Sequence, residues 1–329
     1  MKALVYTGPE AMEYRDAPDP EPNEGEVLLR VDRVGICGSD MHGYLGHDDR
    51  RPPPLILGHE AAGVIVGGSR DGERVAVNPL IIPKDDRFSL AGAEHISQNR
   101  ELISMKPREG AFAEWLAMPG ENLFTIPDTM SFKEAALTEP LSVCWHAAKL
   151  GLRLTDGVGT DTALVLGGGA IGLGTALCLQ AMGLEDVTIV EPNEARGAYL
   201  ADHCGQKVVQ SADAMTGDVD LVADAVGYDV TRETATAKVR PGGVVVHIGL
   251  GGGSAGLDIR RMTLQEIVVA GSYCYTKAEF RETIDAMSSG LLGALDWGEE
   301  RALAEGYGAF QDIRSGNVAA PKIILVPDA

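Results

Sequence analysis

Two short segments near the N-terminus carry side chains that commonly bind metal ions. The first is GICGSDMH at 35–42, which contains Cys37, and the second is GHE at 58–60, which contains His59 and Glu60. Thiolate, imidazole and carboxylate are all zinc ligands. Spacing alone does not show that Cys37 and His59 lie close together in space. Each residue also has a purely structural explanation, as a buried cysteine or as a hydrogen-bonded core histidine. The pair is therefore a candidate metal site that needs further support.

A glycine motif in the middle of the chain indicates a dinucleotide site. Gly167, Gly169 and Gly172 form Gly-x-Gly-x-x-Gly between the apolar run TALVL and the helix-like segment IGLGTALCLQAMG. Such a turn brings the backbone and a helix N-terminus close to a pyrophosphate. Glu191 ends the next apolar run, where a carboxylate hydrogen-bonds a ribose 2′-hydroxyl and repels a 2′-phosphate. We therefore expect NAD and not NADP, with Arg196 among the cofactor-binding residues.

The elements around these motifs change character along the chain. Residues 1–78 show short strand-like runs separated by Gly- and Pro-rich turns, which favours a small barrel. Residues 79–110 lose this pattern, as a surface lobe or functional loop would. From about residue 142, Val-, Ile- and Leu-rich runs alternate with helical segments, which predicts a doubly wound parallel sheet. These runs are TALVL (162–166), VTIV (187–190), KVV (207–209), DLVADAV (220–226) and VVVHIG (244–249).

Length and composition bound the class of protein. A chain of 329 residues is long enough for two domains. The net charge of −20 argues against nucleic acid and anionic membranes as partners, since both attract basic surfaces. The N-terminal MKALVYTGPE lacks an apolar signal core, and no run reaches membrane-spanning length. Five scattered cysteines predict reduced thiols and a cytoplasmic location.

Four motifs in a fixed order give a more specific indication. The segments GICGSDMHGYLGH, LGHEAAGVI, TEPLSVCWHA and VLGGGAIGL follow one another along the chain. This order closely resembles the zinc-containing medium-chain alcohol dehydrogenases, nearest to their sorbitol and butanediol dehydrogenase branch. The resemblance implies an α/β fold with a GroES-like β-rich catalytic domain (1–141 and 293–329) and a Rossmann NAD-binding domain (142–292).

The resemblance also implies roles for the metal-site residues. Cys37 and His59 would be zinc ligands, and Glu60, Glu139 or both would complete the set. Asp40 would hold the His59 imidazole in its ligating tautomer. Glu139 stands where other alcohol dehydrogenases have a second cysteine, which places this chain with the polyol branch.

The resemblance further implies a proton path and a substrate pocket. Ser39 would take the hydroxyl proton of the substrate, and His42 would pass it toward solvent. Tyr44, Phe112 and Trp115 would line the pocket, although aromatic side chains are equally common in a core. The sequence Cys274-Tyr275 departs from sorbitol dehydrogenases, which have an arginine before the tyrosine, so a sorbitol-like fit is not implied.

A second, structural zinc is not expected. Many members of the family bind one through four closely spaced cysteines, but residues 79–110 contain no cysteine. The acidic and histidine side chains of this stretch predict a charged, solvated loop and not a metal site; they are Asp85, Asp86, Glu94 and His95. We therefore expect one catalytic zinc ion per chain.

The predicted reaction is hydride transfer from a secondary alcohol to NAD. The alcohol would belong to a polyol, a sugar alcohol or a vicinal diol. Two alternatives remain at this point: a zinc-free NAD(P)H quinone or enoyl reductase on the same fold, and a non-enzymatic NAD-binding protein. The apolar segment 266–273 (EIVVAGSY) predicts an edge strand, and in relatives this edge pairs across a two-fold axis. A homodimer or homotetramer is therefore expected.

Overall fold

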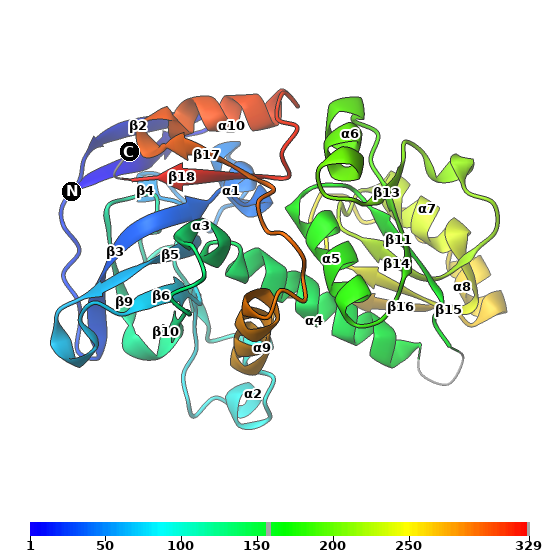
Figure 1. Cartoon of the computed structure of the whole chain (residues 1–329), viewed down its shortest axis with the longest axis horizontal. Helices are drawn as coiled ribbons and strands as arrows, with labels where there is room; N and C mark the ends of the chain where they lie inside the picture. The colour runs from blue at the N-terminus through cyan, green and yellow to red at the C-terminus, as the bar shows by residue number, and fades with distance from the viewer. Residues whose placement is uncertain (156–158, 328–329) are drawn as a thin grey trace.

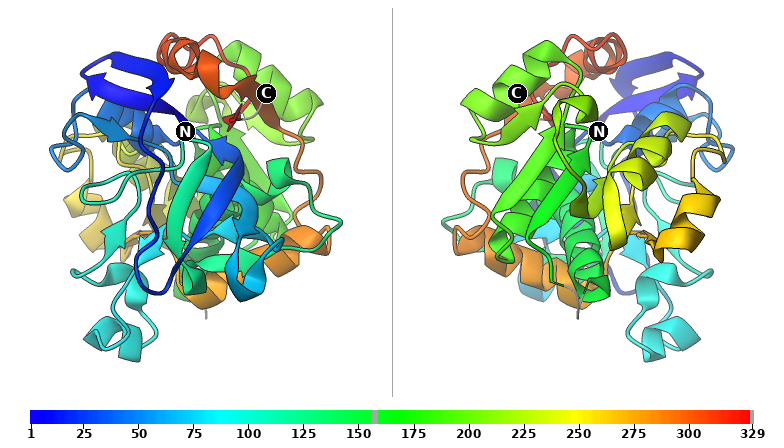
Figure 2. Two further views of the ribbon diagram at one scale, coloured as in Figure 1. Left: turned by 90° about the vertical axis from the view of Figure 1, so that its left-hand side faces the viewer. Right: turned by 90° about the vertical axis from the view of Figure 1, so that its right-hand side faces the viewer.

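The chain forms a β-rich part and a parallel-sheet part that lie side by side (Figure 1). The computed structural model describes residues 1–155 and 159–327. Residues 156–158 of the predicted 142–292 segment and residues 328–329 of the predicted 293–329 segment lie outside the described residues. Figure 2 shows the β-rich part and the parallel sheet from opposite ends of the molecule.

The β-rich part is built on one large mixed sheet. Within the described residues, six strands follow the order β10-β6-β5-β3-β18-β17, and a seventh, β9, also pairs with β3. Their bounds are β3 (Glu26–Gly35), β5 (Glu60–Val66), β6 (Arg74–Val77), β9 (Trp115–Pro119), β10 (Leu123–Thr125), β17 (Gly298–Ala302) and β18 (Lys322–Val326). A second sheet has the order β2-β1-β4, with β1 (Lys2–Gly8), β2 (Ala11–Asp16) and β4 (Leu55–Ile56).

Strands from the two ends of the chain share the large sheet. β18 pairs antiparallel with β3, so the C-terminal segment completes a sheet that the first strands begin. The C-terminal segment contributes α10 (Gly306–Arg314) and β18. β17 was not predicted, because its sequence GEERA is mostly polar and lacks the apolar alternation typical of a strand.

The lobe at 79–110 holds a short antiparallel pair and one small helix. β7 (Leu80–Ile81) pairs with β8 (Glu101–Leu102), and α2 (Arg87–Leu90) lies between them in the chain. Asp86 caps α2 by accepting a hydrogen bond from the Phe88 N–H. The described residues of the lobe contribute no group of metal-ligating side chains.

The prediction of a solvated loop is wrong for His95. Its side chain is buried, and its ring centroid lies 4.8 Å from that of His146. His146 Nδ1 in turn lies 2.9 Å from Glu279 Oε2. Burial disfavours the Glu279 charge, but hydrogen bonds with His146 and with the Thr276 backbone outweigh it and lower the Glu279 pKa to about 2. The lobe is therefore anchored on helices outside it.

The parallel sheet has the strand order of a dinucleotide-binding fold. Within the described residues its order is β13-β12-β11-β14-β15-β16, and every pair is parallel. The order reverses at β11, and sheets of this kind bind ligands at the carboxyl ends of the strands beside the reversal, here β11 and β14. The bounds are β11 (Thr162–Leu166), β12 (Asp186–Val190), β13 (Lys207–Val209), β14 (Val219–Asp224), β15 (Val239–His247) and β16 (Val268–Gly271).

Helices cover both faces of this sheet. Ala163 and Val165 of β11 belong to the apolar cluster shared with α4, α5 and α9. The alternating residues Leu164 and Leu166 face the cluster shared with α7 and α8. The helices are α4 (Thr138–Leu154), α5 (Ala170–Ala181), α6 (Glu194–Asp202), α7 (Asp229–Lys238), α8 (Ile259–Gln265) and α9 (Lys277–Ser288). Among the residues that the structure describes, none of the helices combines the length and apolar character that crossing a bilayer requires.

Helix α4 links the two parts of the chain (Figure 1). It begins beside the large sheet and runs along α5 and α9. A Cβ atom at Gly174 would lie 2.7 Å from Cys144 Sγ, so only glycine allows α4 and α5 to pack this closely. α4 therefore packs closely against α5, the helix that follows the glycine turn.

Candidate active site

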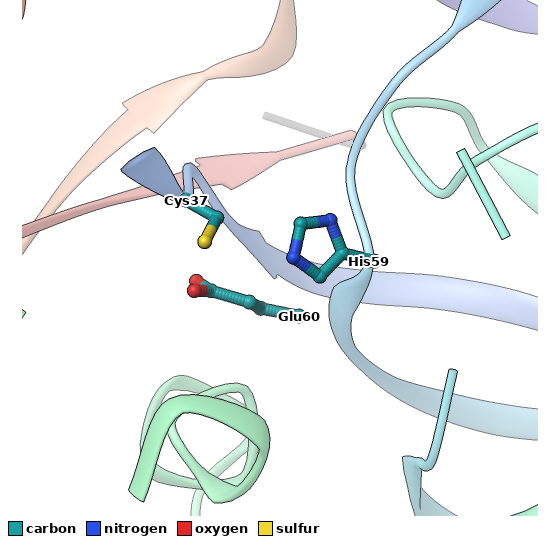
Figure 3. A group of neighbouring side chains, drawn as sticks. All are labelled: Cys37, His59 and Glu60. Carbon is teal, nitrogen blue, oxygen red and sulfur yellow. The ribbon is translucent and has the colours of Figure 1, made fainter. Parts of the chain in front are cut away.

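Three of the predicted metal ligands converge in space. Cys37 directly precedes α1 (Gly38–Tyr44), His59 precedes β5, and Glu60 is the first residue of β5. One ligand atom from each side chain lies within 4.8 Å of the others. Figure 3 shows the three side chains pointing toward one another. The β3–β5 pairing brings them together, since Gly35 at the end of β3 lies opposite Glu60. A Cβ at Gly35 would come 2.1 Å from Glu60 Oε2, so glycine is needed for the carboxylate to fit.

Asp40 joins the two segments that carry Cys37 and His59. Its fully buried carboxylate accepts hydrogen bonds from the Cys37 N–H at 3.0 Å and the Gly58 N–H at 3.2 Å. Asp40 Oδ1 also lies 3.4 Å from His59 Nδ1. The other ring nitrogen of His59 therefore faces Cys37 and Glu60 (Figure 3). This is the arrangement that fixes a ligating imidazole.

The electrostatics of the three-residue group favour a cation. Burial opposes a charge on His59, but the Asp40 carboxylate and the Cys37 sulfur outweigh burial and raise the His59 pKa well above its ordinary value. A divalent metal would benefit from the same negative charges, and its binding would displace the proton. Sulfur, nitrogen and oxygen donors together fit zinc.

Lys322 is a site residue that the sequence did not reveal. Its ammonium lies 2.7 Å from both carboxylate oxygens of Glu60 and donates to the Ile36 carbonyl at 3.0 Å. Both side chains are buried, with 4% of Lys322 and none of Glu60 exposed. Burial alone would lower the Lys322 pKa, but the Glu60 carboxylate raises it. The only signal in the sequence was a lysine at the start of an apolar strand, which ordinarily indicates a solvated strand end.

Glu139 lies in the first turn of α4 but is not part of the three-residue group. Its Oε1 accepts a hydrogen bond from the Tyr275 hydroxyl at 2.9 Å. Burial, together with the neighbouring Glu60 carboxylate, raises the Glu139 pKa to about 7. Glu139 therefore changes charge near neutral pH beside the candidate metal group, whereas Glu60 has a permanent cationic partner.

Cys274, next to Tyr275, adopts an unusual backbone conformation. Its φ of 48° lies in the left-handed region, which non-glycine residues seldom occupy outside constrained sites. Burial and the nearby Glu139 charge raise the Cys274 pKa to about 12, so the thiol stays protonated. The turn after β16 thus places Tyr275 against Glu139 and keeps an uncharged thiol next to it.

Ser39 and His42 lie on α1, three residues apart, and so share a helix face. The guanidinium of Arg51 donates to the Ser39 carbonyl at 2.7 Å and lies 3.4 Å from Ser39 Oγ. Arg51 also donates to the Ser104 carbonyl, and Ser104 Oγ lies 3.4 Å from His59 Nδ1. The buried Arg51 therefore fixes the segment that carries Ser39.

The aromatic residues considered for the pocket lie elsewhere. Tyr44 and Phe112 are buried in the β-domain core, where both rings pack against Phe310. Trp115 lines a cavity of about 710 Å³ whose walls include none of the three converging residues. For Tyr44 and Phe112, the core interpretation was correct.

The glycine turn after β11 has the shape that a pyrophosphate requires. Gly167 has a φ of 94°, and a Cβ at Gly172 would lie 1.7 Å from the Gly167 carbonyl oxygen. A Cβ at Gly169 would meet nothing within 4 Å, so this N-terminal cap of α5 faces open space. Two glycines are thus needed for packing, and the third leaves the helix N-terminus accessible to phosphate.

Glu191 directly follows β12 and fixes this turn. Its Oε2 accepts from the Gly168 N–H at 2.9 Å, and its Oε1 accepts from the Asn193 N–H at 2.8 Å. Arg196 Nη1 lies 3.9 Å from Glu191 Oε2, while Arg196 Nη2 donates to the Val318 carbonyl. Arg196 Nε is buried and has no partner among the described residues. Both predicted cofactor residues therefore lie at the carboxyl edge of the parallel sheet.

A set of zinc-type ligands beside a dinucleotide-binding fold is typical of nicotinamide-dependent oxidoreductases. Comparisons with known proteins support the assignment to this class. Residues 23–128 match the alcohol dehydrogenase GroES-like domain, and residues 170–289 match the zinc-binding dehydrogenase domain. The chain therefore belongs to the zinc-binding medium-chain alcohol dehydrogenase family, with a GroES-like domain and a Rossmann domain.

Individual relatives span most of the chain. Sorbitol dehydrogenase of Bacillus subtilis is 31% identical over 89% of this chain and 87% of its own length. Human sorbitol dehydrogenase is 30% identical over 83% of this chain and 81% of its own length. A dehydrogenase of Sinorhizobium meliloti 1021, solved with NADP bound, has a TM-score of 0.86 at 26% identity and covers 99% of each chain. The family thus binds NAD(P).

Proposed function

We propose that this enzyme oxidises a secondary alcohol within a polyol, sugar alcohol or vicinal diol and transfers the hydride to NAD. The observation that carries the proposal is the convergence of Cys37, His59 and Glu60 within 4.8 Å. Glu139, in place of a second cysteine, and the sorbitol dehydrogenases among the relatives support a polyol substrate.

One zinc ion per chain would be held by Cys37, His59 and Glu60, with Glu139 as a further carboxylate nearby. When bound, the metal supplies positive charge that lowers the pKa of an alcohol hydroxyl. Ser39 accepts the hydroxyl proton and His42 passes it toward solvent. Asp40 acts through His59 by holding the orientation of its ring.

The cofactor is proposed to be NAD and not NADP. The Glu191 carboxylate retains free lone pairs beyond its two backbone bonds, so it can accept hydrogen bonds from ribose hydroxyls. A 2′-phosphate would meet this negative charge. Arg196 would lie beside the same ribose, and its guanidinium is 3.9 Å from the Glu191 carboxylate, which balances its charge.

A homodimer or homotetramer is proposed, formed through the free edge of the parallel sheet. β16 is the last strand of the sheet, and its outer side pairs with no other described strand. It is shorter than predicted, because Glu266 ends α8 in a left-handed conformation. Exposed apolar side chains lie on and near this edge, namely Ile259, Leu264 and Val268. Pairing of two such edges would satisfy their backbone groups.

We also propose a functional division into residues 1–141 with 293–329 and residues 142–292. The boundary at 141 falls within α4, which links the two units. The five cysteines are unpaired, which supports a cytoplasmic location.

The test is turnover with a panel of alcohols. Sorbitol, xylitol, butane-2,3-diol and ethanol would be assayed with NAD and NADP, before and after metal removal. We expect NAD-dependent oxidation of a secondary alcohol that is lost on chelation and restored by zinc. Full activity in metal-depleted enzyme would favour a zinc-free reductase, and strong preference for ethanol would contradict a polyol substrate.

A further inference from the structure

A histidine–aspartate pair lies at the carboxyl edge of the parallel sheet, apart from the candidate metal group. His247 is the last residue of β15 and Asp224 the last residue of β14, and they are direct partners in the strand register. His247 Nδ1 lies 3.1 Å from Asp224 Oδ2. Asp224 is fully buried, whereas 28% of the His247 side chain is exposed. The ring thus projects from a buried anchor into accessible space.

Asp224 is ionised, and its carboxylate oxygens accept hydrogen bonds from groups that the fold holds in place. Its Oδ1 accepts from the Val226 and Gly227 N–H groups, and its Oδ2 accepts from the Thr231 hydroxyl at 3.0 Å. Burial opposes the Asp224 charge, but these bonds and His247 lower its pKa below the ordinary value. An ionised Asp224 requires a proton on His247 Nδ1. In neutral His247, Nε2 therefore carries a lone pair.

The second polar atom of His247 has no hydrogen-bond partner in the described part of the chain. The ring is bonded through Nδ1 to Asp224, and the His247 carbonyl accepts from the Ser272 N–H at 2.9 Å. Ser272 Oγ in the same corner is buried and also lacks a partner among the described residues. The buried Ser272 Oγ and the partly exposed His247 Nε2 are therefore both free to bind a polar group from outside the chain.

The fold indicates which part of a dinucleotide reaches this point. A doubly wound sheet consists of two mononucleotide-binding halves, here β11-β12-β13 and β14-β15-β16. In the first half, Glu191 follows the end of β12, and its carboxylate fixes the turn after β11. In the second half, His247 ends β15, and its partner Asp224 fixes the turn after β14. His247 therefore occupies the place in the nicotinamide half that Glu191 occupies in the adenosine half.

We propose that His247 Nε2 hydrogen-bonds a hydroxyl of the nicotinamide-side ribose and that Asp224 orients the ring for this contact. A ribose hydroxyl both donates and accepts, so it suits either protonation state of the imidazole. This inference rests on NAD(P) binding by the family and does not depend on the identity of the alcohol.

The test compares three ligands by calorimetric titration: ADP, ADP-ribose and NADH. ADP lacks the second ribose, whereas ADP-ribose has that ribose but no nicotinamide. His247→Asn retains a donor at the Nδ1 position, which can still reach Asp224, and removes Nε2. We expect Kd to rise about three- to tenfold for ADP-ribose and NADH, as the loss of one hydrogen bond predicts, and to stay unchanged for ADP. His247→Leu should give the same pattern.

A matched control uses another histidine–aspartate pair, whose histidine lies at the C-terminal end of α6. His203 Nε2 lies 3.3 Å from Asp296, and His203→Asn should change none of the three affinities. A loss for NADH alone would overturn the ribose assignment, and an equal loss for ADP would show that His247 only supports the fold. Unchanged affinities would overturn the inference entirely. Wild-type protein that binds all three ligands but oxidises no alcohol would refute the proposed function and leave this inference standing.

Discussion

Lys322→Met should destabilise the metal-free protein strongly. The substitution leaves the Glu60 carboxylate fully buried without the ammonium that lies 2.7 Å from both its oxygens. Removing one partner of a buried ion pair costs about 3–5 kcal/mol. This is a large fraction of the roughly 5–15 kcal/mol that stabilises a typical protein. At about 2–4 °C per kcal/mol for a domain of 150–250 residues, the melting temperature should fall by roughly 6–20 °C.

The assay is thermal unfolding of chelated and zinc-loaded protein, with Lys207→Met as the matched control. Lys207 pairs with Asp186 at 2.8 Å, nearly the same distance, but both side chains are more than half exposed. An exposed pair contributes only about 0–1 kcal/mol, so the control should lose a few degrees at most. Zinc should reduce the loss in Lys322→Met, because the metal charge replaces part of the missing ammonium.

A double variant tests the origin of the effect. Adding Glu60→Gln to Lys322→Met removes the unpaired charge, so the metal-free double variant should be more stable than Lys322→Met alone, with a coupling energy of about 1–3 kcal/mol. If Lys322→Met and Lys207→Met lose the same stability, the Lys322–Glu60 pair does not have the role that its burial indicates.

Four further outcomes are expected. Cys37→Ser should lose most bound zinc and nearly all activity with the fold retained by circular dichroism, while Cys204→Ser keeps both; an active, metal-free Cys37→Ser enzyme would contradict the site. Glu191→Ser should lower the ratio of kcat/KM with NAD to kcat/KM with NADP, and a wild type that prefers NADP would refute the cofactor assignment. Glu279 has its pKa depressed to about 2 from 4.5, so its stabilisation is complete above pH 4.5 and declines as pH falls toward 2. The Tm gap between wild type and Glu279→Gln should therefore be widest near pH 7 and narrow below pH 4.5, whereas a gap that widens on acidification would contradict this sign. Elemental analysis of dialysed protein should find one zinc per chain, and two tightly held ions would show that the lobe has been misinterpreted.

The features that the sequence predicted best are those set by neighbouring residues. The Gly167–Gly172 turn, the strand before it and the helix after it are consecutive, so their pattern alone indicated the cofactor site. The convergence of Cys37 and His59 depends on the β3–β5 register, and only resemblance to a family supplied it in advance. Local patterns carry little information about such long-range pairing.

The residues that were missed are positioned by distant parts of the chain. Lys322 reaches Glu60 because β18 pairs with β3, across almost the whole sequence. His95 is buried because its ring packs against His146 of α4, whereas its own segment is polar. The left-handed Cys274 is likewise imposed by its surroundings, since cysteine has no preference for positive φ. In each case tertiary contacts override local propensity.

The pairing of β18 with β3 has a consequence for synthesis on the ribosome. At about 5–20 residues per second, roughly 10–50 s separate the appearance of Glu60 from that of Lys322. During that interval the sheet lacks a strand beside β3, and the Glu60 carboxylate lacks its cation. The parallel sheet is translated in between and can fold first. Until β18 is synthesised, the β-rich part therefore has an open sheet edge. During this period the edge is most exposed to chaperones and to mispairing with other strands.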